Sequence, residues 1–128
     1  MAYLYLLQCK TGEYYTGITT DVARRMAAHS GRRAGGAKYT RAHPPAALAA
    51  VWETETYATA ARAEYRLKRL RHAQKAALAA APHRLGDADF PLPEGLCCRP
   101  LTEAEITALL AAGSAPPGQG EKASPHEI

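Results

Sequence analysis

The chain has 128 residues and a formal net charge of +4, and its length suits one domain with one core. It shows neither a run of roughly 20 apolar residues that could cross a membrane nor a signal peptide. Its three cysteines lack the spacing of a disulfide framework or a zinc site. We therefore expect a cytoplasmic protein with reduced thiols and no membrane association. Residues 1–80 hold thirteen Lys and Arg against five Asp and Glu, whereas residues 81–128 hold three against seven, so a basic body that could bind nucleic acid precedes an acidic tail.

The N-terminal segment predicts a β-hairpin. Residues 3–9 form an apolar run in which alternate tyrosines share one face of a strand. A Thr-Gly-Glu turn follows at residues 11–13, and residues 14–18 predict a second short strand. Tyr5 and Tyr15 are therefore expected on neighbouring strands.

A helix is expected after the hairpin. Thr19 or Thr20 is predicted to cap it, and it should extend over residues 21–30. Arg25 and His29 are four residues apart in this segment, so they share one face of the helix.

The loop over residues 31–45 is cationic, rich in glycine and free of acidic residues. Glycine lets backbone N–H groups approach phosphates closely, so we predict that this loop contacts a nucleic-acid backbone. The loop residues expected to make these contacts are Arg32, Arg33, Lys38, Tyr39 and Arg41.

A third strand is predicted over residues 47–54, and helices over residues 59–71 and 72–80. The first of these helices has a buried stripe at helical spacing, made of Ala60, Ala63, Leu67 and Leu70. Glu64 lies on the flank of this stripe. The opposite side, interpreted as a solvated face that could also face DNA, carries Arg62, Arg66 and Arg69. The helix cations expected to contact nucleic acid are Lys68 and Lys75.

The chain changes character towards its C-terminus. A stretch rich in proline and glycine predicts a linker that drapes on the body, and the capping box Thr102-x-x-Glu105 predicts a short helix. Residues 114–128 have the composition of a disordered tail. We therefore divide the chain into a domain over residues 1–82 and a C-terminal part over residues 83–128.

Two phenols, a guanidinium, an imidazole and a carboxylate are thereby placed around one sheet, and such a set suits phosphodiester chemistry. A carboxylate binds Mg²⁺ or Mn²⁺, which need few protein ligands, and an arginine neutralises the charge that develops on the phosphate. A phenol can take a proton from water where cations lower its pKa from the ordinary value of about 10. The five candidates are Tyr5, Tyr15, Arg25, His29 and Glu64.

Several segments carry a family resemblance. Tyr3-Leu4-Tyr5 and, ten residues later, Tyr15-Thr16-Gly17 resemble the paired GIY and YIG motifs of the GIY-YIG nucleases. The resemblance extends over about residues 3–80 and is to the small stand-alone bacterial YhbQ-like group. The further segments that carry it are Ile18-Thr19-Thr20-Asp21, Arg24-Arg25, His29, Gly36-Ala37-Lys38-Tyr39-Thr40 and residues 61–68.

The resemblance implies an α/β fold with a three-stranded antiparallel sheet flanked by helices, followed here by a mostly irregular tail. It implies that Tyr15 is the general base and that Tyr5 orients water or phosphate. Arg25 would bind and stabilise the scissile phosphate, and His29 would hydrogen-bond it or relay a proton. Glu64 would be the one protein ligand of a single Mg²⁺ or Mn²⁺ ion.

The expected function is a metal-dependent endonuclease that hydrolyses phosphodiester bonds in nucleic acid. One compact domain supplies one active site, so we expect nicking of DNA in repair or in the processing of branched structures. Two departures from the family pattern matter: Tyr3 replaces the Gly of the first motif, and the last helix lacks the Asn of excision-repair and homing relatives. Gln74 or Lys75 could replace that Asn.

Other interpretations remain open at this point. The missing Asn suits a nucleic-acid-binding module with weak or no catalysis, and Tyr beside Arg also suits a phosphodiesterase that forms a covalent phosphotyrosine. The tyrosines could be ordinary strand aromatics, and Glu64 could be an ion-pair partner of Lys68, worth about 0.3–0.5 kcal/mol. Glu53 is a rival carboxylate outside the matched motif.

Overall fold

A β-hairpin opens the chain and is followed by a helix, a third strand and two helices, and a further strand and helix come from the C-terminal part. The strands are β1 (Ala2–Cys9), β2 (Tyr14–Thr19), β3 (Pro45–Thr54) and β4 (Arg99–Pro100). The helices are α1 (Val22–His29), α3 (Tyr57–Lys68), α4 (His72–Ala80), the short 3₁₀ helix η1 (Pro82–Arg84) and α5 (Glu103–Ala112). This computed structural model describes residues 1–29 and 45–112.

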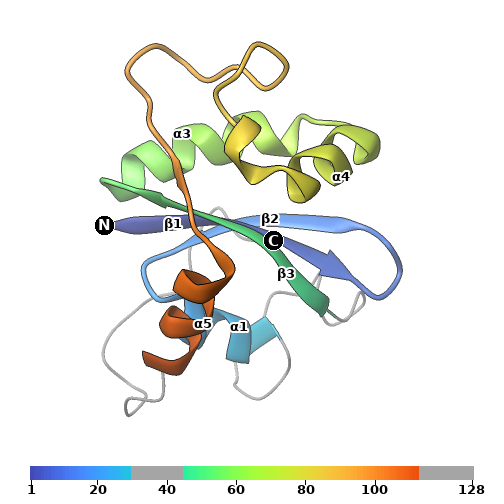
Figure 1. Cartoon of the computed structure of the whole chain (residues 1–128), viewed down its shortest axis with the longest axis vertical. Coiled ribbons are helices and arrows are strands. Elements are labelled where there is room, and N and C mark those ends of the chain that lie inside the picture. Colours follow the sequence, from blue (N-terminus) through green and yellow to red (C-terminus); the bar gives the residue numbers. More distant parts are fainter. Residues whose placement is uncertain (30–44, 113–128) are drawn as a thin grey trace.

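The strands form one antiparallel sheet in the order β2-β1-β3-β4, with helices on both faces (Figure 1). Helices α3 and α4 cover one face, which we call the upper layer, and α1 and α5 lie against the other face, the lower layer (Figure 1). The predicted α/β fold is confirmed, and its three expected strands are β1, β2 and β3. Strand β4 adds a short fourth strand beside β3.

The hairpin between β1 and β2 is closed by the predicted turn. The Cys9 N–H donates to the Glu13 carbonyl oxygen at 2.8 Å. Gly12 has a φ of +95°, a conformation that glycine adopts without steric cost. A residue with a side chain would be strained there, which explains the position of glycine in this turn.

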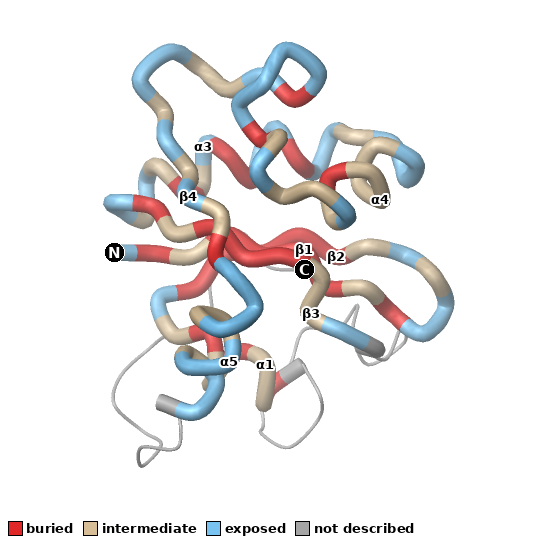
Figure 2. The backbone as a smooth tube through the Cα atoms, viewed as in Figure 1, coloured by how far each residue is buried: buried red, intermediate tan, exposed pale blue. Residues whose placement is uncertain are grey.

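Alternation along the strands divides the buried side chains between two cores, one in each layer. The strands between the helices of the two layers are largely buried (Figure 2). Leu4 and Leu6 of β1 contribute to the upper core, whereas Tyr5 and Leu7 contribute to the lower core. The upper core also contains Ile18, Trp52, Ala60, Ala63, Leu67, Leu78 and Phe90. The lower core also contains Cys9, Tyr15, Val22, Val51 and Leu101. Both faces of the sheet are therefore buried, and a functional side chain on a strand belongs to one layer only.

The cap of α1 differs from the prediction. The helix starts at Val22, and Asp21 caps it, because the Asp21 side chain accepts a hydrogen bond from the Arg24 N–H at 3.1 Å. Thr19 acts one step earlier, where its hydroxyl oxygen accepts from the Asp21 N–H at 3.0 Å. Asp21 was expected inside the first turn, and the error arises because threonine and aspartate are both good caps.

The helix α3 begins earlier and ends earlier than predicted. Thr56 caps it by accepting a hydrogen bond from the Thr59 N–H at 3.1 Å, so Thr59 lies inside the first turn. The helix ends at Lys68 with Arg69 as its C-cap. The predicted stripe is buried at Ala60, Ala63 and Leu67, while Leu70 beyond the helix is partly buried. Helix α4 has the predicted bounds.

The C-terminal part packs on the body through its described residues. Phe90 is buried in the upper core and Leu101 in the lower core. The predicted capping box of α5 is confirmed, because the Thr102 N–H donates to the Glu105 side chain at 3.0 Å and the Glu105 N–H donates to the Thr102 hydroxyl at 3.1 Å. Among the described residues, no helix has the length and apolar character needed to cross a membrane.

Candidate active site

Tyr5 and Tyr15 lie side by side in the lower core. Strand register places Tyr5 opposite Gly17 and Leu7 opposite Tyr15, so the two phenols project from adjacent strands on the same face. Their ring centroids are 6.3 Å apart, with an angle of 33° between the ring planes, and the exposed fractions of the two residues are 0% and 1%. The predicted proximity of these two tyrosines is confirmed.

Gly17 makes room for the Tyr5 phenol. A Cβ atom at position 17 would lie 2.5 Å from Tyr5 Cζ, closer than such atoms approach in proteins. Neither partner can move away easily, because both belong to paired strands in the buried sheet. The glycine of the second motif therefore fixes where the phenol of the first motif lies.

Arg25 joins the tyrosines in the lower layer. It is 9% exposed and lies on α1, whose Val22 and Met26 pack against the core that contains both phenols. Burying a guanidinium is costly unless it is paired or held for an anion. His29 is the last residue of the same helix. Its side chain lies outside the described part of the structure.

Glu64 lies in the upper layer, on the flank of α3 as predicted. It is 2% exposed, and its Oε2 atom is 3.6 Å from Lys68 Nζ, so the anticipated ion pair is present. Burial raises the pKa of Glu64 from 4.5 to about 7, and the positive charge of Lys68 offsets part of this rise. The charged form of Glu64 is therefore unfavourable near neutral pH because the carboxylate is buried. A bound cation would offset this penalty.

A cavity of about 510 Å³ borders Glu64. Its lining contains three cations, Arg62, Arg66 and Lys68, and no second carboxylate. The other residues that line it are Ala61, Tyr65 and Pro93. An anionic ligand that enters this cavity reaches Glu64 with arginine and lysine beside it.

Lys75 belongs to the same electrostatic group. Burial lowers its pKa, and the charge of Lys68 lowers it further, which places the two predicted nucleic-acid contacts near each other. Gln74 has a structural role, because its side-chain oxygen accepts a hydrogen bond from the Arg71 N–H at 2.9 Å at the start of α4. Of the two residues considered as replacements for the missing Asn, Lys75 is the one without such a capping role.

The candidate residues thus divide into two groups across the sheet. Tyr5, Tyr15 and Arg25 are in the lower layer, whereas Glu64, Lys68 and Lys75 are in the upper layer. The predicted loop contacts, which lie outside the described residues, are Arg32, Arg33, Lys38, Tyr39 and Arg41.

The rival carboxylate Glu53 is engaged elsewhere. It lies 3.3 Å from Arg99, which also donates to Glu105 at 2.9 Å, so these three side chains link β3, β4 and α5. Within residues 1–29 and 45–112, no three or more His, Cys, Asp or Glu side chains gather in a way that could hold a metal ion. A metal at Glu64 would therefore keep most of its ligands as water or substrate oxygens.

Tyr65 was not among the predicted site residues, and it is 60% exposed on the outer side of α3. Helical spacing places it away from the buried stripe and among the arginines of the helix, and that position was the available signal.

The family to which the chain belongs follows from comparison with known proteins. A model of the GIY-YIG catalytic domain matches residues 1–77. This match spans more than half of the chain and includes both tyrosines, Arg25 and Glu64. The chain therefore belongs to the GIY-YIG family of nucleases, as its motifs suggested.

Within this family the chain is similar to proteins named UPF0213. It is 46% identical over 78 residues to a UPF0213 protein of Halobacterium salinarum, covering 61% of this chain and 99% of that one. It is 51% identical over 75 residues to one of Xanthomonas axonopodis pv. citri, covering 59% and 72%. A solution NMR structure of the UPF0213 protein of Bacillus halodurans is 40% identical, with 68% and 95% coverage and a TM-score of 0.41. The match covers almost the whole length of the Halobacterium salinarum protein, so the resemblance to a small stand-alone group is confirmed.

Proposed function

We propose that the chain is a metal-dependent endonuclease that nicks DNA, with Glu64 as the protein ligand of one Mg²⁺ or Mn²⁺ ion. The observation that carries this proposal is the buried carboxylate of Glu64, whose pKa is raised to about 7 beside a cavity lined by cations. A buried acid with a strongly shifted pKa in a cavity is typical of a functional site. The family match includes this residue and supplies the class of reaction.

The donor set fits a magnesium-type ion. Mg²⁺ usually keeps several waters and binds through one or two carboxylates together with substrate phosphates. Glu64 offers one carboxylate in a cavity of about 510 Å³, which leaves room for water and phosphate ligands. When bound, such an ion supplies Lewis-acid stabilisation of charge on the phosphate.

The remaining residues of the site would act on the phosphate and on the attacking water. Tyr15 takes the proton of the water, Tyr5 orients the water or the phosphate, and Arg25 binds the scissile phosphate. His29 hydrogen-bonds the phosphate or relays a proton.

These roles require the lower-layer groups to act together with Glu64. Strand β2 is an edge strand of the sheet, and α3 packs against β2 and β1 from the upper layer. The substrate phosphate would therefore lie at the β2 edge, where side chains from the two layers can approach the same atom. Nicking, rather than cutting of both strands, follows from a single site of this kind.

A nucleic-acid-binding module with weak catalysis is the second candidate. It is favoured by the hydrogen bond that the Gln74 side chain accepts at the start of α4. Gln74 is one of the two residues that could replace the Asn of other relatives, and this hydrogen bond occupies its side-chain oxygen. Lys75 would then contribute charge to binding without positioning the phosphate as an amide does.

One gel experiment separates the candidates. Purified wild-type protein is incubated with nicked, flapped and branched DNA and Mn²⁺, then denatured with detergent before electrophoresis. Free cleaved strands support the endonuclease, binding without cleavage supports the weak module, and a strand linked to protein supports a covalent phosphotyrosine.

Glu64→Ala should abolish cleavage and leave DNA affinity within a few-fold, because phosphate contacts supply the affinity. Glu53→Ala is the matched control and should cut like wild type.

A further inference from the structure

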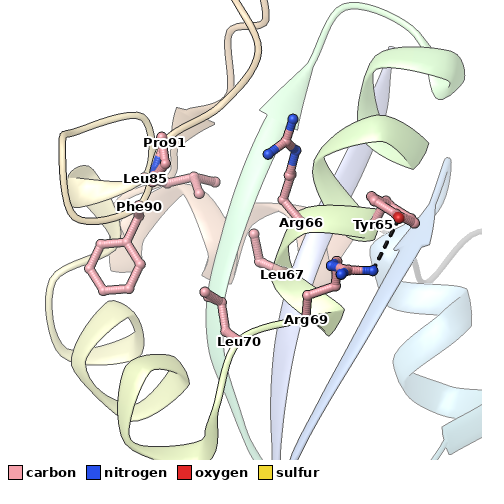
Figure 3. A pocket seen from close by; sticks show the side chains of 8 residues that line it. All are labelled: Tyr65, Arg66, Leu67, Arg69, Leu70, Leu85, Phe90 and Pro91. Atoms are coloured by element: carbon pink, nitrogen blue, oxygen red, sulfur yellow. Dashed lines mark hydrogen bonds between the residues drawn. The ribbon is translucent and has the colours of Figure 1, made fainter.

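A second cavity lies between α3 and the segment that follows η1. It has a volume of about 190 Å³. Leu85, Phe90 and Pro91 lie on one side of it and α3 on the other (Figure 3). The residues contributed by α3 and the turn after it are Tyr65, Arg66, Leu67, Arg69 and Leu70. The pocket thus has apolar walls and an opening that carries an exposed aromatic ring and two cations.

The charge of this pocket is of one sign. Its eight lining residues, all within the described part of the chain, include two arginines and no carboxylate. Arg69 donates a hydrogen bond to the Tyr65 hydroxyl at 3.1 Å, and its guanidinium carbon lies 5.3 Å from the centroid of the Tyr65 ring (Figure 3). This contact fixes the orientation of the exposed Tyr65 ring. A ligand with a flat apolar body and an anionic attachment fits such a surface.

The pocket is adjacent to the cavity that borders Glu64, because Tyr65 and Arg66 line both of them. A chain-like ligand bound at Glu64 would therefore pass over the outer side of α3 to reach the apolar pocket. Such a ligand would meet cations along this path from Arg66 and Lys68.

One wall of the pocket, formed by Leu85, Phe90 and Pro91, comes from the C-terminal part of the chain. The family match ends at residue 77, whereas Leu85, Phe90 and Pro91 follow it. The subsite is therefore an addition to the matched nuclease domain.

We propose that this pocket binds one unpaired base of a nucleic-acid strand whose adjoining phosphates contact Arg66 and Arg69. An unpaired base has a flat apolar body that stacks on aromatic and guanidinium groups, and its phosphates match the arginines at the opening. The volume of about 190 Å³ lies below the roughly 300–1,000 Å³ of pockets for drug-sized ligands, so it suits one ring system. This inference rests on the proposed function, because it places the unpaired base on a strand that leads to Glu64.

The test measures binding without cleavage, in a Glu64→Gln background free of divalent metal. The probes are a short single strand of DNA or RNA with one 2-aminopurine, whose fluorescence is quenched by stacking, and a DNA duplex of the same length. Tyr65→Ala and Arg66→Ala should each lower the ratio of single-strand to duplex affinity by about tenfold, within the scale of about 1–3 kcal/mol for base stacking. Leu70→Phe, which narrows the pocket without changing charge, should lower the same ratio and relieve the quenching.

Lys10→Ala is the control, because it removes one exposed cation in the β1–β2 hairpin, on a different element from the pocket. It should leave the ratio unchanged. Unquenched 2-aminopurine with the parent protein, or variants that weaken single-strand and duplex binding equally, would overturn the base pocket. Cleavage by the wild type in Mn²⁺ is measured separately, so loss of the proposed nuclease function is distinguishable from loss of the pocket.

Discussion

Replacing Glu64 with glutamine should stabilise the metal-free protein at about pH 8. The glutamate is ionised at this pH, and burial makes its charged form unfavourable in the folded state, which raises its pKa from 4.5 to about 7. A raised folded pKa contributes stability that is present below about pH 4.5 and is lost as the pH rises through about 7. At about 1.4 kcal/mol for each tenfold change in proton affinity, the loss is about 3 kcal/mol. Glutamine has a similar shape and no charge, so it should not show this loss.

The assay is denaturant unfolding of both proteins in chelator at about pH 5 and about pH 8. Glu64→Gln should gain on wild type by about 2–3 kcal/mol at the higher pH, and much less at the lower pH. Glu53→Gln is the control, since that carboxylate is partly exposed and paired with Arg99, and it should show no such gain. Equal stability of Glu64→Gln and wild type at both pH values would refute the argument that burial holds this carboxylate in an unfavourable charged state.

The same variant tests the metal. At about pH 8, Mn²⁺ should raise the midpoint of thermal unfolding of wild type, because an ion that binds only the folded state stabilises it by mass action. Glu64→Gln should show little response. A matched rise in both proteins would place the ion elsewhere.

Further predictions concern the phenols, the glycine and the loop. Tyr15→Phe should lower the cleavage rate by at least about a hundredfold, as expected for a general base; near-normal cleavage by this variant with an inactive Tyr5→Phe would reverse the two roles. Gly17→Ala should lower the free energy of unfolding by about 1–3 kcal/mol, because a Cβ atom there overlaps the Tyr5 ring, and an unchanged denaturation curve would contradict this. Arg32→Ala/Arg33→Ala should weaken DNA binding for all sequences and reduce the slope of log K against log salt by nearly two, at about 0.9 per phosphate contact; an unchanged slope would show that the loop is only solvated.

The hairpin and the helices were predictable because their signals are local. Alternation along residues 3–9 and a glycine turn define β1 and β2, and the register that follows brings Tyr5 next to Tyr15. The apolar stripe of α3 and the capping box of α5 were likewise visible in the sequence. Helix starts were less certain, since Asp21 and Thr56 compete with neighbouring residues that cap equally well, and backbone geometry makes the choice.

The fourth strand could not be predicted because it has no periodicity. β4 consists of Arg99 and Pro100 only, and it exists because Trp52 and Glu53 of β3 offer an edge with which to pair. The burial of Leu101 beneath it depends on that pairing. Such tertiary contacts are absent from any short window of sequence.

The sequence was sufficient to predict which residues belong to the candidate site. It was not sufficient to predict how deeply they are buried or on which face of the sheet they lie. Flank positions on a helix can face either the core or the solvent, so the sequence could not tell that Glu64 is nearly fully buried and has a raised pKa. Strand alternation predicted the shared face of the tyrosines, but only the packing of α3 on the other face shows that Glu64 belongs to the opposite layer.

This division assigns a double role to the C-terminal part. Leu101 packs in the core that holds Tyr5 and Tyr15, and Phe90 packs in the core beneath α3, so both halves of the candidate site are supported by residues beyond the family match. Phe90 is constrained by this packing, whereas its neighbour Pro91 is exposed beside the pocket and can vary without disturbing the matched residues. In the proposed nuclease, the affinity for an unpaired strand would therefore change through substitutions in this segment, while the residues proposed for catalysis stay the same.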